Sequence, residues 1–220
     1  VTEIGGIQTD LPTLSHAELW SLAEDSDLRC PDDCAAERMR RRIDAAREAG
    51  DSQGGIFHVT ATGLPVGLGS HVQWDRRLDA RLVAAVVSIP AIKGAEIGPA
   101  FQNAALPGTQ VHDEIHSDGR GGVVRRTNRA GGFEGGMTNG MPIVVRAAMK
   151  PIPTTVSPLR SVDLETGESA ETEYQRSDIC AVPAASIVGE AMVAWALADA
   201  LIEKLGGDSL EEMKNRYAAG

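Results

Sequence analysis

The 220-residue chain has few aromatic side chains, three cysteines and no excess of basic residues. Phe, Trp and Tyr together make up only 4% of it, so a core has to be built from Ala, Val, Ile and Leu. Hydrophobic residues reach 42%, which is too many for a disordered protein. The net charge of −10 argues against a general nucleic-acid-binding protein. No apolar run reaches membrane-spanning length and no signal peptide is visible, so we expect a cytoplasmic protein that contacts no membrane.

The cysteines Cys30, Cys34 and Cys180 are too few and too scattered for a disulfide framework. Cys30 and Cys34 form a CxxxC pair, and His16 is the only other metal-ligand candidate of their kind nearby. Because a structural zinc site needs four ligands, the sequence does not favour a metal here.

The run RRTNRAGGFEGGMTNG, from Arg125 to Gly140, is unusually rich in glycine. Glycine permits positive φ and a close approach of backbone to a ligand, so such a loop can turn N–H groups onto an anion or a flat ring. The run contains neither GxxxxGK[ST] nor GxGxxG, which excludes the common nucleotide loops. Arg125, Arg126 and Arg129 would give this loop a local basic pocket. The alternative is a glycine-rich surface turn without a ligand.

Capping residues and apolar periodicity predict helices over residues 15–25, 34–50, 76–88, 184–205 and 209–217. Ser15 and Glu18 form a capping box at the start of the first. Asp32 or Asp33 can cap the second, and Asp208 is expected to cap the last.

Alternating β-rich stretches predict strands within 54–69 and over 141–150, 159–164 and 170–175. The last two are joined by 165–168 as a hairpin. We interpret 89–101 as a second ligand loop and 103–124 as a mobile excursion, in which His112 and His116 have a spacing that a metal could use. Strand pairs and helices without a regular βαβ rhythm predict an α+β fold with antiparallel sheets and packed helices.

Several charged residues follow the ends of predicted elements, where binding sites tend to be built. The cations are Lys93, Arg129, Lys150 and Arg176, and Asp178 follows the last of them closely. Fixed cations suit a phosphate or a carboxylate, so these residues predict binding of an anionic small molecule or a phosphate-bearing cofactor. Arg176 and Asp178 could instead form a simple ion pair.

Six phrases in this order, GDSQGG, GLPVGLGS, SIPAIKGAEIG, RRTNRAGGFEGGMTNG, MKPIPT and RSDICAVPAA, resemble the chorismate synthase family over residues 50–190. The resemblance implies part of that family's β-α-β sandwich and a homotetramer. It also implies elimination of phosphate from 5-enolpyruvylshikimate 3-phosphate to give chorismate, with reduced FMN as cofactor. NADPH is a possible reductant of the flavin.

The resemblance also implies roles for individual residues. Arg176 is expected near flavin and substrate, and Asp178 is expected to assist proton transfer at flavin N5, which a carboxylate can do. The other residues expected to contact FMN are Pro90, Ala91, Gly135, Lys150, Pro151, Ile152, Pro153 and Thr154.

The sequence departs from the family at three phrases. No GESHG-type motif, RPGHAD-type motif or ARETAARVA-type segment occurs, and no histidine of this chain matches the first two. Residues 1–220 are therefore expected to be the C-terminal portion of a single chorismate synthase domain, inactive alone and weak in flavin binding. The alternative is a non-catalytic fragment that retains anion binding or oligomer contacts.

Overall fold

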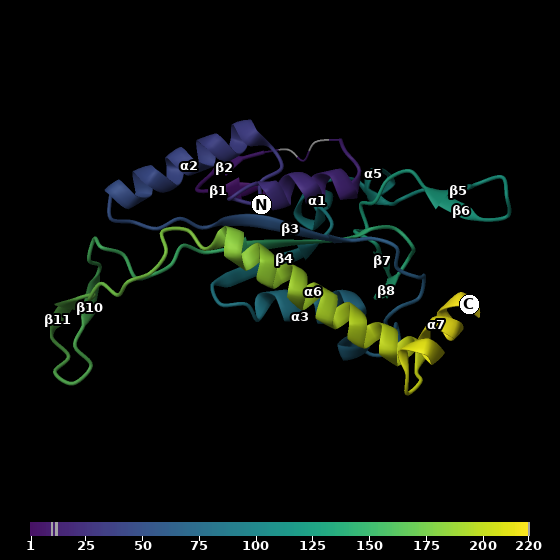
Figure 1. Ribbon diagram of the computed structural model, residues 1–220. Helices are drawn as coiled ribbons and strands as arrows, with labels where there is room; N and C mark the ends of the chain where they lie inside the picture. Colours follow the sequence, from purple (N-terminus) through teal and green to yellow (C-terminus); the bar gives the residue numbers. More distant parts are fainter. Residues whose placement is uncertain (10, 12, 220) are drawn as a thin grey trace. The chain divides into compact units, whose positions relative to one another are not determined.

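The computed structural model describes residues 1–9, 11 and 13–219 (Figure 1). Its helices are α1 (His16–Asp25), α2 (Asp33–Glu48), α3 (Leu78–Val87), α4 (Ala100–Asn103), α5 (Gly108–Val111), α6 (Val182–Leu205), α7 (Leu210–Ala219) and the 3-10 turn η1 (Trp74–Arg76). Its strands are β1 (Glu3–Ile4), β2 (Ile7–Gln8), β3 (Gly55–Ala61), β4 (Ile92–Ile97), β5 (Ile115–Ser117), β6 (Val123–Arg125), β7 (Phe133–Glu134), β8 (Met137–Thr138), β9 (Ile143–Met149), β10 (Arg160–Val162) and β11 (Ser169–Glu171). This mixture confirms the predicted α+β class.

The main sheet has five strands in the order β2-β1-β3-β9-β4. β1 pairs antiparallel with β2 and with β3, so that Glu3 faces Gln8 on one side and Ile56 on the other. Three further antiparallel hairpins are β5–β6, β7–β8 and β10–β11. The last confirms the predicted hairpin, with strands shorter than expected.

The predicted helix starts are confirmed at two of three positions. The Ser15 side chain accepts a hydrogen bond from the Glu18 N–H, and the Glu18 carboxylate accepts one from the Ser15 N–H, which completes the capping box of α1. Asp32 caps α2. The prediction for α7 was wrong by one residue. Ser209 accepts the hydrogen bond of the Glu212 N–H at 3.2 Å, whereas the Asp208 N–H donates to the Glu212 carboxylate.

Two predicted loops contain regular structure. Residues 89–101 are not a ligand loop throughout, because β4 occupies their centre and buries Ile92 and Glu96. The glycines and prolines at both ends concealed a strand of only six residues. Residues 103–124 hold the short helix α5 and the hairpin β5–β6.

The chain forms two compact units. The first comprises residues 1–58, 90–94 and 147–187. Its helix α2 packs on β1 and β2 (Figure 1). Its most buried apolar side chains include Ile4, Met39, Phe57 and Val182.

The second unit comprises residues 59–89, 95–146 and the chain from 188 on. Its helix α3 packs against η1 and β8. Its buried core includes Leu68, Leu78, Leu82, Val145 and Val193.

Helix α6 has 24 residues and a mean hydropathy of 1.6 over its most apolar stretch, enough by length and composition to cross a membrane. The sequence prediction that no apolar run reaches that length was therefore wrong. The core helices of soluble proteins pass the same test, so α6 alone is weak support for a membrane protein.

Candidate functional site

Hydrogen bonds join three segments that carry predicted cofactor contacts, namely the turn before β4, the segment after β9 and the segment before α6. The Lys150 N–H donates to the carbonyl oxygen of Ala91 at 3.0 Å. The Ser177 hydroxyl donates to the carbonyl oxygen of Thr154 at 3.0 Å. All three segments belong to the first unit, so residues far apart in the sequence are brought together there.

The turn between α2 and β3 holds two of these segments in place. The buried Ser52 hydroxyl donates to the carbonyl oxygen of Ile152 at 2.6 Å. The Gln53 N–H donates to the carbonyl oxygen of Ile179 at 2.7 Å, and Gln53 forms a parallel bridge with Cys180. Ile152 is a predicted FMN contact, whereas Ser52 and Gln53 were not predicted as site residues, although the phrase GDSQGG that contains them was part of the family resemblance.

Gly54 permits the closest of these backbone approaches. A Cβ atom at this position would lie 2.3 Å from the Met149 carbonyl oxygen and 2.9 Å from the Pro151 nitrogen. Both distances are far below a normal van der Waals separation, and the atoms belong to backbone that cannot rotate away. Only glycine therefore lets the turn pack against the Lys150 segment.

Ala91 has a φ of +67°, a left-handed conformation that residues with a Cβ seldom adopt. Its carbonyl oxygen accepts the hydrogen bond from the Lys150 N–H. This contact with a neighbouring segment helps to keep Ala91 in the left-handed conformation. Strained backbone of this kind clusters at functional sites, where the fold over-determines it. The composition of the segment gave no sign of this strain.

Replacing Ala91 by glycine should stabilise the chain by about 0.5–1 kcal/mol, because relief of the left-handed strain exceeds the greater flexibility of unfolded glycine. Ala95, in β4, is the matched control. It has no positive φ, so Ala95→Gly should destabilise by about 0.5–1 kcal/mol. Urea denaturation of both variants measures the difference. Equal destabilisation by both substitutions would contradict strain at Ala91.

The charged side chains of these segments are free to bind a ligand. Lys150, Arg176 and Asp178 are exposed, and within the described part of the chain none of them has a side-chain hydrogen bond or an ion pair. Arg176 and Asp178 therefore do not form the simple ion pair that the sequence left open. Two uncommitted cations can bind phosphate or carboxylate oxygens, and an uncommitted carboxylate can hold a proton.

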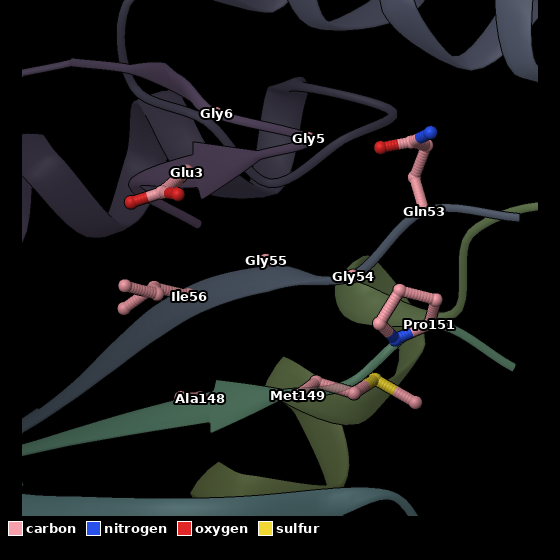
Figure 2. A pocket seen from close by; sticks show the side chains of 10 residues that line it. All are labelled: Glu3, Gly5, Gly6, Gln53, Gly54, Gly55, Ile56, Ala148, Met149 and Pro151. Carbon is pink, nitrogen blue, oxygen red and sulfur yellow. The ribbon is translucent and has the colours of Figure 1, made fainter.

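A pocket of about 350 Å³ borders the same segments. Figure 2 shows Met149 and Pro151 at the end of β9, beside the Gly54 backbone. Of the predicted FMN contacts only Pro151 lines it, so this pocket does not gather the others. Its lining residues are Glu3, Gly5, Gly6, Gln53, Gly54, Gly55, Ile56, Ala148, Met149 and Pro151.

Gly135, the remaining predicted FMN contact, lies in the second unit, at the turn of the β7–β8 hairpin. Gly135 and Gly136 have φ values of +61° and +84°, which explains why this turn uses glycine. Gly135 is exposed, and a Cβ added there would meet no atom within 4 Å. The backbone at Gly135 is therefore open to a flat ligand. Gly136 instead accepts a hydrogen bond from the Leu78 N–H at 2.9 Å.

Asn128 organises the rest of the glycine-rich run. Its side-chain amide donates to the Pro142 carbonyl oxygen at 2.7 Å, and its side-chain oxygen accepts from the Gly132 N–H at 2.9 Å. A Cβ on Gly131 would lie 2.4 Å from the Gly98 nitrogen, so these two glycines let two backbone segments touch. The run is thus a rigidly braced hairpin.

The structure does not support the sites that the sequence suggested for Arg125, His112 and His116. Arg125 is paired with Glu134 at 3.0 Å, so it is not free for an anion as the sequence had suggested. His112 follows α5 and His116 lies in β5, so they do not share a helix. Among the residues that the structure describes, no group of three or more His, Cys, Asp or Glu side chains is placed to hold a metal.

Comparisons with known proteins place the chain in a family. The sequence model of the family described as chorismate synthase matches residues 1–202. The chorismate synthase of Desulforamulus reducens is 57% identical over 217 residues, which cover 98% of this chain and 56% of that protein. That of Geobacter sulfurreducens is 56% identical over 224 residues, covering 99% of this chain and 57% of that protein.

A solved structure extends the likeness to the fold. A crystal structure of chorismate synthase superimposes with a TM-score of 0.83 at 46% identity, covering this whole chain and 60% of that one. The chain thus spans a little over half the length of the curated relatives it matches. By sequence and by fold, it belongs to the chorismate synthase family.

Proposed function

We propose that this chain supplies one part of the site at which a chorismate synthase binds reduced FMN and eliminates phosphate from 5-enolpyruvylshikimate 3-phosphate to give chorismate. The observation that supports this most directly is the hydrogen-bonded junction of the Ala91, Lys150 and Ser177 segments. The three segments that it joins carry nine of the ten residues that the family resemblance predicts for the site. A homotetramer, a cytoplasmic location and NADPH as the reductant of the flavin belong to the same proposal.

The residues present fit such a cofactor. Lys150 and Arg176 are cations without a partner among the described residues, as a phosphate or a flavin with anionic character requires. Gly135 offers exposed backbone with open space above it. Reduced FMN, when bound, would supply electron density to the substrate without net oxidation.

The protein side chains would stabilise the negative charge of the leaving phosphate and transfer the proton that the elimination releases. Arg176 would neutralise the phosphate oxygens as the C–O bond to the leaving phosphate breaks, and Lys150 would hold the flavin cofactor. Asp178 would assist the transfer of the proton that the elimination releases, because a carboxylate can polarise or accept it. The braced backbone around Gly54 would keep the side chains of Lys150, Arg176 and Asp178 at a constant separation. Catalytic groups held in a fixed geometry lower the barrier to reaction.

The proposal is testable in a hybrid protein, in which residues 1–220 replace the matching segment of the Geobacter sulfurreducens relative. In this hybrid, Lys150→Ala should weaken FMN binding about tenfold or more, because a charge-assisted hydrogen bond contributes roughly 1.5–3 kcal/mol. Flavin fluorescence quenching measures the dissociation constant. Lys214→Ala, which removes an exposed cation from α7, is the matched control and should leave it unchanged. Equal affinities in the two variants would remove Lys150 from the site.

A further inference from the structure

The second unit contains a pocket of about 380 Å³ that no predicted FMN contact lines. It lies between the excursion that holds α5 and the start of the glycine-rich run. Its lining residues are Asn103, Val111, His112, Asp113, Ile115, Arg129, Ala130 and Glu134. Its volume falls in the range of small-molecule sites.

Both carboxylates of this pocket are already engaged within the protein. Asp113 accepts hydrogen bonds from the N–H groups of Arg129 and Ala130, each at 2.9 Å, and from the Thr127 hydroxyl. Burial opposes its ionisation, yet these hydrogen bonds leave the pKa of Asp113 below its ordinary value. The carboxylate is therefore charged at neutral pH, and three donors already offset its charge.

Glu134, the other carboxylate, is engaged in the same way. It accepts hydrogen bonds from the Arg125 guanidinium at 3.0 Å and from the Asn139 side-chain amide at 3.2 Å. Neither carboxylate of the pocket therefore depends on the side chain of Arg129 for compensation.

Two side-chain donors of the pocket, Arg129 and His112, are not engaged. Within the described residues, the side chains of Arg129 and His112 have no hydrogen bond and no ion pair. Arg129 is half-buried, so its positive charge is partly shielded from water. An uncompensated guanidinium lining a pocket favours an anionic ligand, and its planar fork matches a carboxylate or a phosphate.

Asn103 contributes a hydrogen-bond acceptor to the pocket, in contrast to the donor Arg129. Its side-chain amide nitrogen donates to the Arg129 carbonyl oxygen at 2.8 Å, which orients the group. Its side-chain oxygen is buried and has no hydrogen-bond partner among the described residues. A buried acceptor left without a donor is unfavourable, and native proteins seldom retain one without a reason. A ligand hydroxyl or N–H would supply the missing donor.

We propose that this pocket binds a small oxyanion that also carries a hydroxyl group, with its charge on Arg129 and its hydroxyl on the Asn103 side-chain oxygen. Carboxylates and phosphates share the required chemistry. The site is distinct from the predicted FMN contacts, because none of them lines it. The three neighbouring arginines then have different roles. Arg129 binds the anion, Arg125 pairs with Glu134, and Arg126 does not line the pocket.

The test uses three probes and NMR titration of the ¹⁵N-labelled chain. Glycolate and acetate differ by one hydroxyl, and inorganic phosphate distinguishes a phosphate site from a carboxylate site. We expect saturable shifts at Arg129, Ala130 and Asn103, with glycolate binding about threefold to tenfold more tightly than acetate, the effect of one hydrogen bond. Tighter binding of phosphate than of glycolate would assign the charged group as a phosphate, and the reverse order would assign it as a carboxylate.

Arg129→Ala should weaken binding of the tighter probe at least tenfold, while Arg126→Ala, an exposed arginine of the same run, should leave it within twofold. Retained amide dispersion in both variants shows that each still folds. Equal weakening by the two substitutions would show that only general charge attracts the anion. That result, or the absence of saturable binding by every probe, would overturn the proposal, and equal binding of glycolate and acetate would overturn the role of Asn103.

Discussion

Replacing Gly54 by alanine should destabilise the chain by about 3 kcal/mol, because the new methyl group has no space. It would lie 2.3 Å from the Met149 carbonyl oxygen and 3.0 Å from the Lys150 carbonyl carbon, both backbone atoms. The chain can accept the methyl group only by moving the Lys150 segment away from the turn at Ser52. We therefore expect a melting temperature roughly 6–12 °C lower than that of the parent chain.

Gly94→Ala is the matched control for this substitution. Gly94 lies within β4, has no positive φ, and a Cβ added there meets nothing within 4 Å. Alanine should be tolerated or even stabilise by about 0.5 kcal/mol, because it is less flexible than glycine in the unfolded chain. Thermal unfolding of the two variants compares them directly. Similar stability of both would show that the backbone approach at Gly54 is not needed.

Asp178→Ala, made in the hybrid protein, should lower kcat by about 10²–10⁴-fold, the usual contribution of a group that transfers a proton. The FMN dissociation constant should change far less, because Asp178 carries negative charge and is not expected to hold the cofactor phosphate. Its exposed carboxylate has no partner within the described residues, so its removal disturbs no ion pair. Stopped assays with reduced FMN and fluorescence titrations provide the two numbers.

Glu173→Ala removes the same charge from the same exposed segment and serves as the control. It should leave both kcat and FMN affinity within about twofold, the scale of a screened surface charge. Equal losses of turnover and of FMN affinity in Asp178→Ala would remove its proposed role in proton transfer. So would a drop of the same size in Glu173→Ala.

Local sequence signals predicted the helices α1, α2, α3, α6 and α7 and the strands β3, β9, β10 and β11, but most of the other, short strands were not predicted. Ser15 with Glu18, and Asp32, mark helix starts because their side chains satisfy backbone N–H groups within three residues. At the adjacent capping residues Asp208 and Ser209 these signals selected the wrong one. They fail again at β4, where a short buried strand lies between glycines and prolines.

The candidate site was less predictable because long-range packing creates it. Neither the hydrogen bond from Ser52 to Ile152 nor the left-handed φ of Ala91 has a local sequence signature. The Arg129 side chain has no ion-pair partner in the described part of the chain because both nearby carboxylates are already engaged. Asp113 accepts backbone N–H groups, and Glu134 pairs with Arg125. The family resemblance selected the segments, and only the structure shows how their backbones are joined.

Turnover by the hybrid protein tests the central claim most directly. Formation of chorismate and release of phosphate from 5-enolpyruvylshikimate 3-phosphate are measured anaerobically with reduced FMN, beside the unmodified Geobacter sulfurreducens relative. We predict a kcat within about tenfold of that relative, because the two segments are 56% identical and we expect them to fold alike. A hybrid that folds and binds FMN yet forms no chorismate would contradict the proposal that residues 1–220 supply part of a chorismate synthase active site.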